Sequence, residues 1–379
     1  MKVLHIDGSG TPTHVSSIIE LLNAAGVEQC TLNHIDNVKY PPNIHKYVFP
    51  FKKNTFIRVG SKKYVEMSKF IANVINVEKP DLIHSYNPFN SIFAMSLALK
   101  YSGSPGIIHL WGQNDLVPSG DVHAEVVNCL KSSVFAASDM HIKFVKEANR
   151  LYHTNKDFVR ILPPIFFEFY DRSPVKLDAP RILLSRTLDR AYIRTLLCPA
   201  LRTFLIKNKY IRLTVLYKDT TIDIYNKFFA DLKNVTKQPL CDRYAFSKVI
   251  QNNNIVVSIT QDSGASATTL QSMYCGNVTI EATHKISSLT DNNCVLSDID
   301  TNKFYNKLVY AVDNYKSLSA KFYKNNKFVY NSLNTVKLFS NLLSYYKTLF
   351  PKFDSGAAEQ LLSAYYKKMV SDFMCGNVS

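Results

Sequence analysis

Short runs of apolar, β-branched residues alternate with longer amphipathic segments through the first half of the chain. Residues 3–6 (VLHI) have the pattern of a buried strand, and residues 14–25 repeat apolar positions at helical spacing. Further strands are predicted at residues 81–84, 106–110 and 134–137, and helices at residues 62–77, 89–101, 121–132 and 139–151. Strands that alternate with helices of this length predict a parallel, doubly wound α/β sheet.

The pattern is lost over residues 161–180, which contain four prolines, and then resumes as a second alternating series. This series predicts strands at residues 182–184, 213–217, 254–259 and 278–280, and helices at residues 193–207, 222–233, 243–251 and 268–274. Two amphipathic helices, residues 332–350 and 356–374, close the chain, and their apolar stripes are typical of packing. We therefore predict domains at residues 1–165 and 181–330, a linker at 166–180, a helical segment at 331–379, and a ligand cleft between the α/β halves.

Composition places the chain among globular proteins, with 379 residues of which 46% are hydrophobic. The net charge of +15 is uneven, because residues 1–170 hold 17 Lys/Arg and 14 Asp/Glu whereas the remainder holds 28 and 16. Such an excess suggests a polyanionic partner or an anionic membrane surface. No apolar run of 18 residues and no signal peptide is recognised, so we expect a cytoplasmic protein, peripheral at most to a membrane. The seven cysteines lack metal-ligand spacing, which predicts free thiols and no structural zinc.

The segment of residues 259–283 contains a small-residue turn between a predicted strand and a predicted helix. A turn of little side-chain bulk before a helix exposes backbone N–H groups, which favour a phosphate or diphosphate. The alternative is an ordinary strand–helix junction in which small residues allow close packing. The residues of this turn are Ser263, Gly264, Ala265 and Ser266.

This segment resembles the nucleotide-sugar site of family-4 glycosyltransferases, retaining enzymes of the GT-B fold with the usual pattern E-G-x-x-x-x-x-L-E-A-M-x-x-G-x-P-V-I. Ser263, with Asp262 beside it, stands at the first glutamate of the pattern, and Gln271 stands at the second. The resemblance implies that Asp262 and Ser263 contact the donor sugar and that Gln271 contacts the ribose hydroxyls. The matching positions are Gly264, Leu270, Met273, Gly276 and Ile280.

A second resemblance lies in the loop after the first strand of the second series. Ser185 and Arg186 are similar to the start of the family segment [SG]-R-x-x-x-x-K-[GN], while Ala191 stands at its lysine. Arg190 is the candidate substitute for that lysine, and Lys218, after the next strand, is a weaker one. Cations here would neutralise a diphosphate and the charge that develops as it leaves. The alternative is a pair of ordinary surface arginines.

The first half contains three shorter resemblances to the same family. Trp111, Gly112 and Asp115 resemble the H/W-G-x-D turn with one inserted residue, which implies that Trp111 lines a sugar pocket and makes Asp115 a catalytic candidate. His84 and Tyr86 resemble the P-D-hydrophobic-hydrophobic-H-x-H segment and are candidate acceptor ligands. A core tryptophan and a hydrogen-bonded strand histidine are the alternatives. The donor-phosphate loop of the pattern corresponds to Gly8, Ser9 and Gly10.

A basic segment interleaved with aromatic residues spans residues 46–69 and contains a single acid, Glu66. In GT-B enzymes the N-terminal domain takes the acceptor, so this segment is placed to dock one. Lysines with aromatic residues suit an anionic membrane surface, suit DNA equally, and also occur on an ordinary solvated surface. The candidate docking residues are Lys52, Lys53, Arg58, Lys62 and Lys63.

The resemblance covers most of residues 1–316 and implies a GT-B enzyme with two Rossmann-like domains. It also implies a nucleotide-sugar donor and transfer with retention of the anomeric configuration. No metal or other cofactor is expected, because no paired carboxylate motif for a metal stands in the expected place. We favour an envelope lipid or polysaccharide as the acceptor. Two alternatives stay open: transfer to hydroxylated bases of DNA, and a non-catalytic GT-B binding module that has lost both family glutamates.

Overall fold

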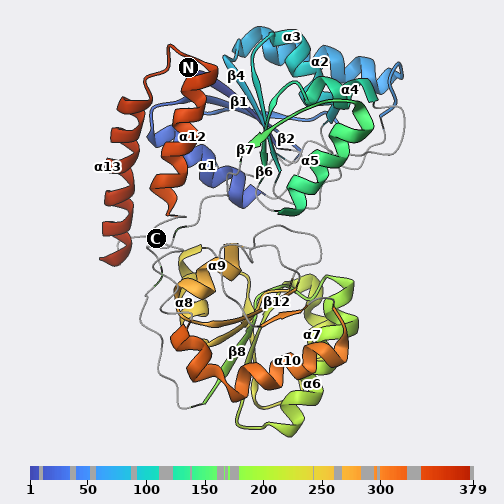
Figure 1. The fold of residues 1–379 in the computed structure, drawn as a ribbon, viewed down its shortest axis with the longest axis vertical. Coiled ribbons are helices and arrows are strands. Elements are labelled where there is room, and N and C mark those ends of the chain that lie inside the picture. The colour runs from blue at the N-terminus through green and yellow to red at the C-terminus, as the bar shows by residue number, and fades with distance from the viewer. Residues whose placement is uncertain are drawn as a thin grey trace. The chain divides into compact units, whose positions relative to one another are not determined.

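The computed structural model describes residues 1–7, 12–34, 40–51, 57–86, 92–110, 123–136, 139–159, 166, 170, 179–241, 243–259, 267–282, 294–296, 299–321 and 334–375. The chain divides into two compact units, each treated by itself below (Figure 1). The first unit contains Met1–Pro164 together with Thr335–Ser379, and the second contains Ile165–Asn334.

The first unit is built on a seven-stranded sheet in the order β3-β2-β1-β4-β5-β6-β7, and all of its pairings are parallel. From β1 the chain adds β2 and β3 on one side and then returns to add β4 on the other, so the strand order reverses between β1 and β4. The strands are β1 (Lys2–Asp7), β2 (Glu28–Asn33), β3 (His45–Val48), β4 (Leu82–Tyr86), β5 (Gly106–Leu110), β6 (Ser133–Ala136) and β7 (Phe158–Val159).

Five helices alternate with these strands, so the predicted doubly wound α/β architecture is confirmed for this half. Helices α2 and α3 cover an apolar face of the sheet that includes Leu4, Ile83 and Ile108. The helices are α1 (Pro12–Ala24), α2 (Lys62–Glu78), α3 (Ile92–Ser102), α4 (His123–Cys129) and α5 (Asp139–Tyr152).

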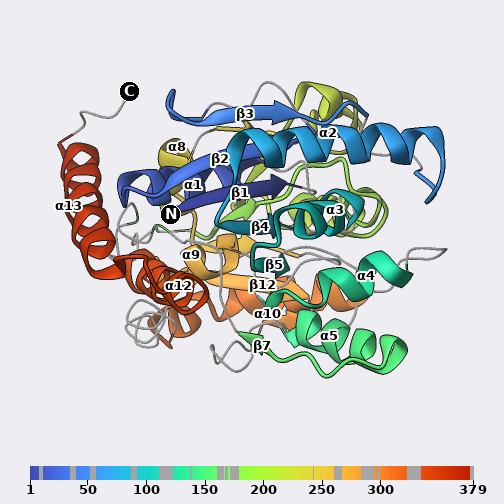
Figure 2. The same ribbon diagram turned by 90° about the horizontal axis from the view of Figure 1, so that it is seen from above.

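The two C-terminal helices, α12 (Thr335–Leu349) and α13 (Ser355–Met374), belong to the first unit and pack against each other (Figure 2). Tyr346 of α12 lies 2.7 Å from Nδ1 of His84 in β4, and the Tyr365 hydroxyl of α13 lies 2.8 Å from Glu20 of α1. The sequence left these helices as a separate segment because periodicity shows an apolar stripe but not its partner. Their partners lie more than 200 residues earlier in the chain.

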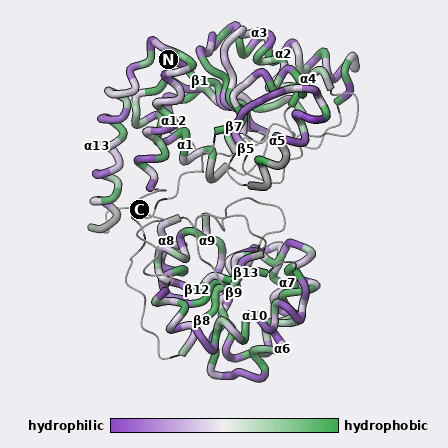
Figure 3. Tube along the Cα trace, in the orientation of Figure 1, coloured by the Kyte–Doolittle hydropathy of each residue, from purple (hydrophilic) through white to green (hydrophobic). Residues whose placement is uncertain are grey.

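The second unit has a six-stranded sheet in the order β10-β9-β8-β11-β12-β13, again with parallel pairings. Its strands are β8 (Arg181–Leu184), β9 (Arg212–Tyr217), β10 (Val235–Pro239), β11 (Ile255–Val257), β12 (Val278–Ala282) and β13 (Val295–Leu296). Its helices are α6 (Cys198–Lys207), α7 (Ile222–Phe229), α8 (Arg243–Gln251), α9 (Ala267–Tyr274) and α10 (Thr301–Asp313). Hydrophobic segments concentrate in the sheet and on the helix sides that face it (Figure 3).

The helix predicted over residues 193–207 forms, but its first turn is wider than an α-helix. Ile193–Leu197 is a π-helical turn, and the N–H of Cys198 donates to the carbonyl of Ile193, five residues earlier. Pro199, near the start of α6, has no N–H and so cannot donate to the carbonyl of Thr195. The π turn accommodates the missing hydrogen bond without ending the helix.

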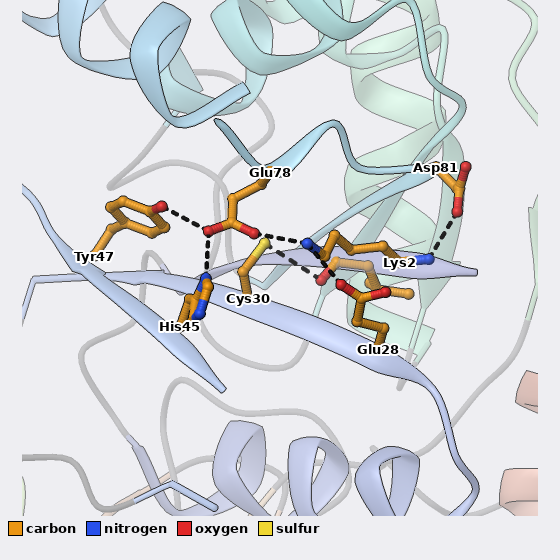
Figure 4. Close-up of polar contacts among 8 residues, drawn as sticks. Lys2, Glu28, Cys30, His45, Tyr47, Glu78 and Asp81 are labelled. Atoms are coloured by element: carbon orange, nitrogen blue, oxygen red, sulfur yellow. Dashed lines mark hydrogen bonds and ion pairs between the residues drawn. The ribbon is translucent and has the colours of Figure 1, made fainter. Parts of the chain in front are cut away.

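A buried carboxylate joins the edge strand β3 to β1 at the amino edge of the first sheet (Figure 4). The Glu78 side chain is 1% exposed and accepts hydrogen bonds from Tyr47 at 2.6 Å, Lys2 at 2.9 Å and His45 at 2.9 Å. Burial by itself would raise the pKa of Glu78, but the bonds from Tyr47, Lys2 and His45 outweigh it and leave that pKa below its ordinary value. This cluster therefore favours ionised Glu78 in the folded unit.

Candidate functional site

The site follows from the topology of the second unit. In an open parallel sheet, ligands bind outside the carboxyl ends of the strands, where the strand order reverses. In the second unit this point lies between β8 and β11, which are adjacent in the sheet although β9 follows β8 in sequence. The N–H and hydroxyl of Ser185 both donate to the carbonyl of Val257, at 3.1 and 3.0 Å, and hold the end of β8 against β11.

Arg186 leaves β8 at this reversal point. Its side chain is partly buried, and burial lowers the pKa of its guanidinium below the ordinary value; the nearby Arg190 lowers it further, whereas Tyr192 acts in the opposite direction. The hydroxyl of Tyr192 donates to the carbonyl of Ile259 at 3.0 Å, so it ties the arginine loop to the segment after β11. A partly dehydrated cation held in this way favours an anionic ligand.

The other two cationic candidates stand on neighbouring segments. Arg190 is exposed in the same loop as Arg186. Lys218 follows β9, and its Nζ lies 3.0 Å from Oδ2 of Asp189, so Lys218 is brought to the arginine loop. Asp189 also accepts a 2.6 Å hydrogen bond from the hydroxyl of Thr187. Sequence reasoning missed this role of Asp189, because its partner is 29 residues away and no spacing rule connects them.

Burial by itself would raise the pKa of Asp189, but Thr187 and Lys218 outweigh it and lower that pKa below its ordinary value. The carboxylate is therefore charged when it holds Lys218. The structure thus brings Arg186, Arg190 and Lys218 to the carboxyl ends of β8 and β9, the region where the sequence placed the donor diphosphate.

Gln271 lies partly buried on α9, the helix that follows β11. The hydroxyl of Thr269 on α9 lies 3.1 Å from the hydroxyl of Ser258, which fixes the helix against the end of β11. Gly276 ends this helix with φ +80°, a left-handed conformation that favours glycine, as the sequence predicted. Asp262, Ser263, Gly264, Ala265 and Ser266 lie outside the described residues.

His84 and Tyr86 lie in the interior of the first unit and are 0% exposed. Parallel register places His5 of β1 beside His84, and His109 of β5 beside Tyr86, all on one face of the sheet. The ring centroid of His84 lies 6.0 Å from that of His5 and 5.5 Å from that of His109. We call His5, His84, Tyr86, His109 and Tyr346 the histidine layer.

The histidine layer is joined by side-chain hydrogen bonds. The Tyr86 hydroxyl lies 3.0 Å from Nδ1 of His5, and the Tyr346 hydroxyl lies 2.7 Å from Nδ1 of His84. Burial lowers the pKa of His5 to about 3 and, with the charges of His109 and His5, lowers that of His84 well below its ordinary value. The layer therefore packs α12 onto the sheet through neutral imidazoles, a role that sequence reasoning missed. The part of His84 and Tyr86 in acceptor binding stays a prediction.

The basic side chains in the described part of the basic segment are on the surface, whereas Phe49 is buried and Tyr47, Phe51 and Tyr64 pack against the apolar core. Arg58 precedes α2, and Lys62 and Lys63 lie in its first turn, where all three side chains are exposed. The hydroxyl of Ser61 caps this helix by accepting from the N–H of Tyr64 at 3.2 Å. Cations at a helix N-terminus oppose the helix dipole, so these lysines do not stabilise α2. The candidates outside the described residues are Gly8, Ser9, Gly10, Lys52, Lys53, Trp111 and Asp115.

The described residues contain neither a metal-binding cluster nor a membrane-spanning helix. No group of three or more His, Cys, Asp or Glu side chains there has the arrangement of a metal site. Among the same residues, no helix combines the length and the hydrophobicity needed to cross a bilayer.

Comparison with known proteins rests on structure alone, because no family model and no curated protein matches the sequence. A glycosyltransferase from Rickettsia africae ESF-5 superposes with a TM-score of 0.70 at 14% identity, covering 93% of this chain and 99% of that one. Sucrose-phosphate synthase from Thermosynechococcus elongatus gives 0.68 at 13% identity, covering 93% and 100%. These neighbours are glycosyltransferases with two Rossmann-like domains. The chain has the GT-B fold.

A third solved structure adds a ligand to the GT-B comparison. Anabaena HepE, solved in complex with UDP-glucose, gives a TM-score of 0.65 at 13% identity and covers 92% of this chain and 100% of that one. The predicted fold class is thereby confirmed, with α12 and α13 as its C-terminal helices. At these identities the likeness shows the fold alone.

Proposed function

We propose that this GT-B protein is a retaining glycosyltransferase that moves a sugar from a nucleotide-sugar to a hydroxyl acceptor without a metal ion. The observation that carries the proposal is Arg186, held partly dehydrated where the strand order reverses between β8 and β11. Arg190 and Lys218 stand on the neighbouring segments. Nucleotide-sugars carry an anionic diphosphate, which is the chemistry that such a set of cations binds.

In this mechanism Arg186, with Arg190 or Lys218, binds the donor diphosphate. Negative charge on the diphosphate grows as the bond to the sugar breaks, so fixed cations stabilise the transition state more than the bound donor. A phosphate oxygen of the leaving group takes the proton of the acceptor hydroxyl on the face that it leaves, and this retains the configuration. Gln271 contacts the ribose, and the amides of residues 263–266 contact the phosphates.

The first unit takes the acceptor in this proposal, and we favour an envelope lipid or polysaccharide. The exposed Arg58, Lys62 and Lys63 support an anionic acceptor or membrane surface, and Trp111 and Asp115 are the candidates at the sugar. The same lysines would contact DNA phosphates, so transfer to hydroxylated DNA bases is the second candidate. The third candidate function is a non-catalytic binding module. It is favoured by the serine and the glutamine that stand at the two glutamate positions of the family pattern.

Hydrolysis of a panel of nucleotide-sugars tests the proposal, because transferases of this type also transfer to water slowly. Arg186→Ala is expected to lower kcat by about 100-fold or more while changing donor affinity less, since the lost stabilisation belongs to the transition state. Arg202→Ala is the matched control, because Arg202 pairs with Asp231 on the surface. Equal kcat in wild type and Arg186→Ala would remove Arg186 from the mechanism. No turnover and no donor-induced rise in Tm would favour the binding module.

A further inference from the structure

Two turns form an exposed end of the second unit, after α6 and after α7. The side-chain amide of Asn234 joins them, because it donates to the carbonyls of Ile211 at 2.9 Å and Leu205 at 3.4 Å. Both turns lie at the amino edge of the sheet, since each leads directly into the start of a strand, β9 or β10. The loop of Arg186 lies at the opposite, carboxyl edge, so donor binding does not account for these turns.

The charge at this end is positive and largely uncompensated. Lys209, Arg212 and Lys233 are exposed, and within the part of the chain that the structure describes none of them makes an ion pair. The nearby acid, Asp231, is already neutralised by Arg202, with nitrogen–oxygen distances of 2.6 and 2.7 Å. An anionic surface would therefore meet cations here without displacing an acidic partner.

Large apolar side chains stand among these cations. Tyr210 is 62% exposed, the highest value among the exposed large hydrophobic side chains of the described residues, and Ile206 is 49% exposed. Lys207 lies over the ring of Tyr305 at 5.7 Å, which places this cation beside α10. Figure 1 shows α6 and α10 side by side in this unit. We call this surface the α6 tip: Ile206, Lys207, Lys209, Tyr210, Arg212 and Lys233.

We propose that the α6 tip binds the surface of an anionic lipid bilayer. Its cations contact lipid phosphates, while Tyr210 and Ile206 enter the headgroup region, where tyrosine rings and aliphatic side chains lose contact with water. Nucleic acid would use the same cations, but an exposed isoleucine gains little against a phosphate backbone. The combination of aliphatic, aromatic and cationic side chains on two joined turns therefore favours a membrane. This inference does not depend on the proposed transferase activity.

Sedimentation of the full chain with phosphatidylcholine vesicles, prepared with and without phosphatidylglycerol, tests the proposal. Lys209→Gln with Lys233→Gln is expected to weaken binding to the anionic vesicles by about 20- to 30-fold, at about fivefold for each lysine. Lys367→Gln with Lys368→Gln on α13 removes two exposed lysines elsewhere and serves as the matched control. Tyr210→Ser is expected to weaken binding less, and by the same factor at low and high salt, because its contribution is not ionic.

Thermal unfolding of each variant shows whether it folds. Replacing exposed lysines that make no ion pair is expected to leave Tm unchanged. If the α6-tip and α13 variants lost vesicle binding to the same extent, the proposal would be overturned, because binding would then depend on net charge alone. A matching assay with duplex DNA distinguishes the other partner. The membrane proposal would also be overturned if the wild-type protein bound DNA but not anionic vesicles, and if the α6-tip variant no longer bound DNA. That result would assign the surface to nucleic acid.

Discussion

The two units share a strand order but differ in what lies under the helices on one side of the sheet. In the second unit, α6 and α10 pack on the apolar centre of one face, which includes Ile182, Val215 and Val257. In the first unit, the face toward α12 carries the histidine layer, and Gln29 on the same face donates to the carbonyl of Ile19 in α1 at 3.0 Å. The same architecture is therefore stabilised by dispersion and water exclusion in one unit and by a hydrogen-bonded aromatic layer in the other.

This difference makes the two units respond differently to protons. The buried cluster under α6 and α10 contains no His, Asp, Glu, Lys or Arg, so its stability depends little on pH in the acid range. Buried neutral imidazoles are destabilised when they become charged, because burial removes the water that would solvate the charge. The first unit should therefore be the acid-sensitive half of the protein, and the following changes test that contrast.

Acid is expected to have the largest effect. His5 and His84 have folded pKa values below the ordinary value of 6.5, so the unfolded chain binds more protons and stability falls as pH drops below about 6.5. At pH 5 the two histidines together lower the free energy of unfolding by about 4 kcal/mol. Hydrogen exchange at pH 5 and pH 7, corrected for intrinsic rates, should show loss of protection in α12 and not in α6. An equal loss of protection in α12 and α6 would contradict the expected difference in acid sensitivity between the two units.

Glu78→Gln should destabilise the first unit by about 3 kcal/mol, because Lys2 loses a buried ionic partner and three hydrogen bonds are weakened. Urea unfolding followed by the fluorescence of Trp111, the single tryptophan, measures this. Glu147→Gln is the control, since Glu147 pairs with Arg150 on the surface and should change stability by less than about 0.5 kcal/mol. The depressed pKa of Glu78 means that its contribution is present above about pH 4.5 and is lost in stronger acid. Equal stability of the two variants would show that the cluster contributes nothing.

Tyr346→Phe removes the hydroxyl that bonds His84 while keeping the ring, so it tests the histidine layer without a cavity. We expect a loss of about 1 kcal/mol, because Nδ1 of His84 loses its 2.7 Å bond to Tyr346 and keeps only the longer contact, 3.3 Å, with the Tyr86 hydroxyl. Tyr345→Phe is the matched change one residue away, where the lost bond goes to the partly buried Ser133, and its cost should be smaller. Chemical denaturation at pH 7 gives both values. If Tyr346→Phe left the free energy of unfolding unchanged, packing alone would hold α12 against the sheet.

Gln271→Glu is expected to have the smallest effect on stability, because the side chain is only partly buried and makes no side-chain hydrogen bond with the described residues. If Gln271 meets the ribose of the donor, a carboxylate there should retain or raise donor hydrolysis, as the family resemblance implies. Steady-state kinetics with the preferred donor measures this. Complete loss of activity with an unchanged Tm would show that the second unit has been rebuilt around a neutral group at this position.

The strands that the sequence predicted are short runs in which most residues are hydrophobic and buried. Residues 106–110 and 243–251 form the predicted elements at the predicted bounds. β2 (EQCTLN) was not predicted, because Gln29, Thr31 and Asn33 alternate with apolar residues and face the polar side of the sheet. β10 (VTKQP) was missed for a related reason: it is an edge strand whose side chains are largely exposed.

Sequence alone determined the doubly wound architecture and the position of Arg186 after a strand, because both follow from local periodicity and from a short motif. Tertiary structure decided which distant groups meet: Lys218 with Asp189, Glu78 with Lys2 and His45, and α12 with the histidine layer. Hydrophobic patterning has a range of a few residues, whereas these contacts join segments from 29 to 262 residues apart. Such pairs form only when the sheet order is set, because the sheet brings the strand ends, and the polar groups that they carry, into contact.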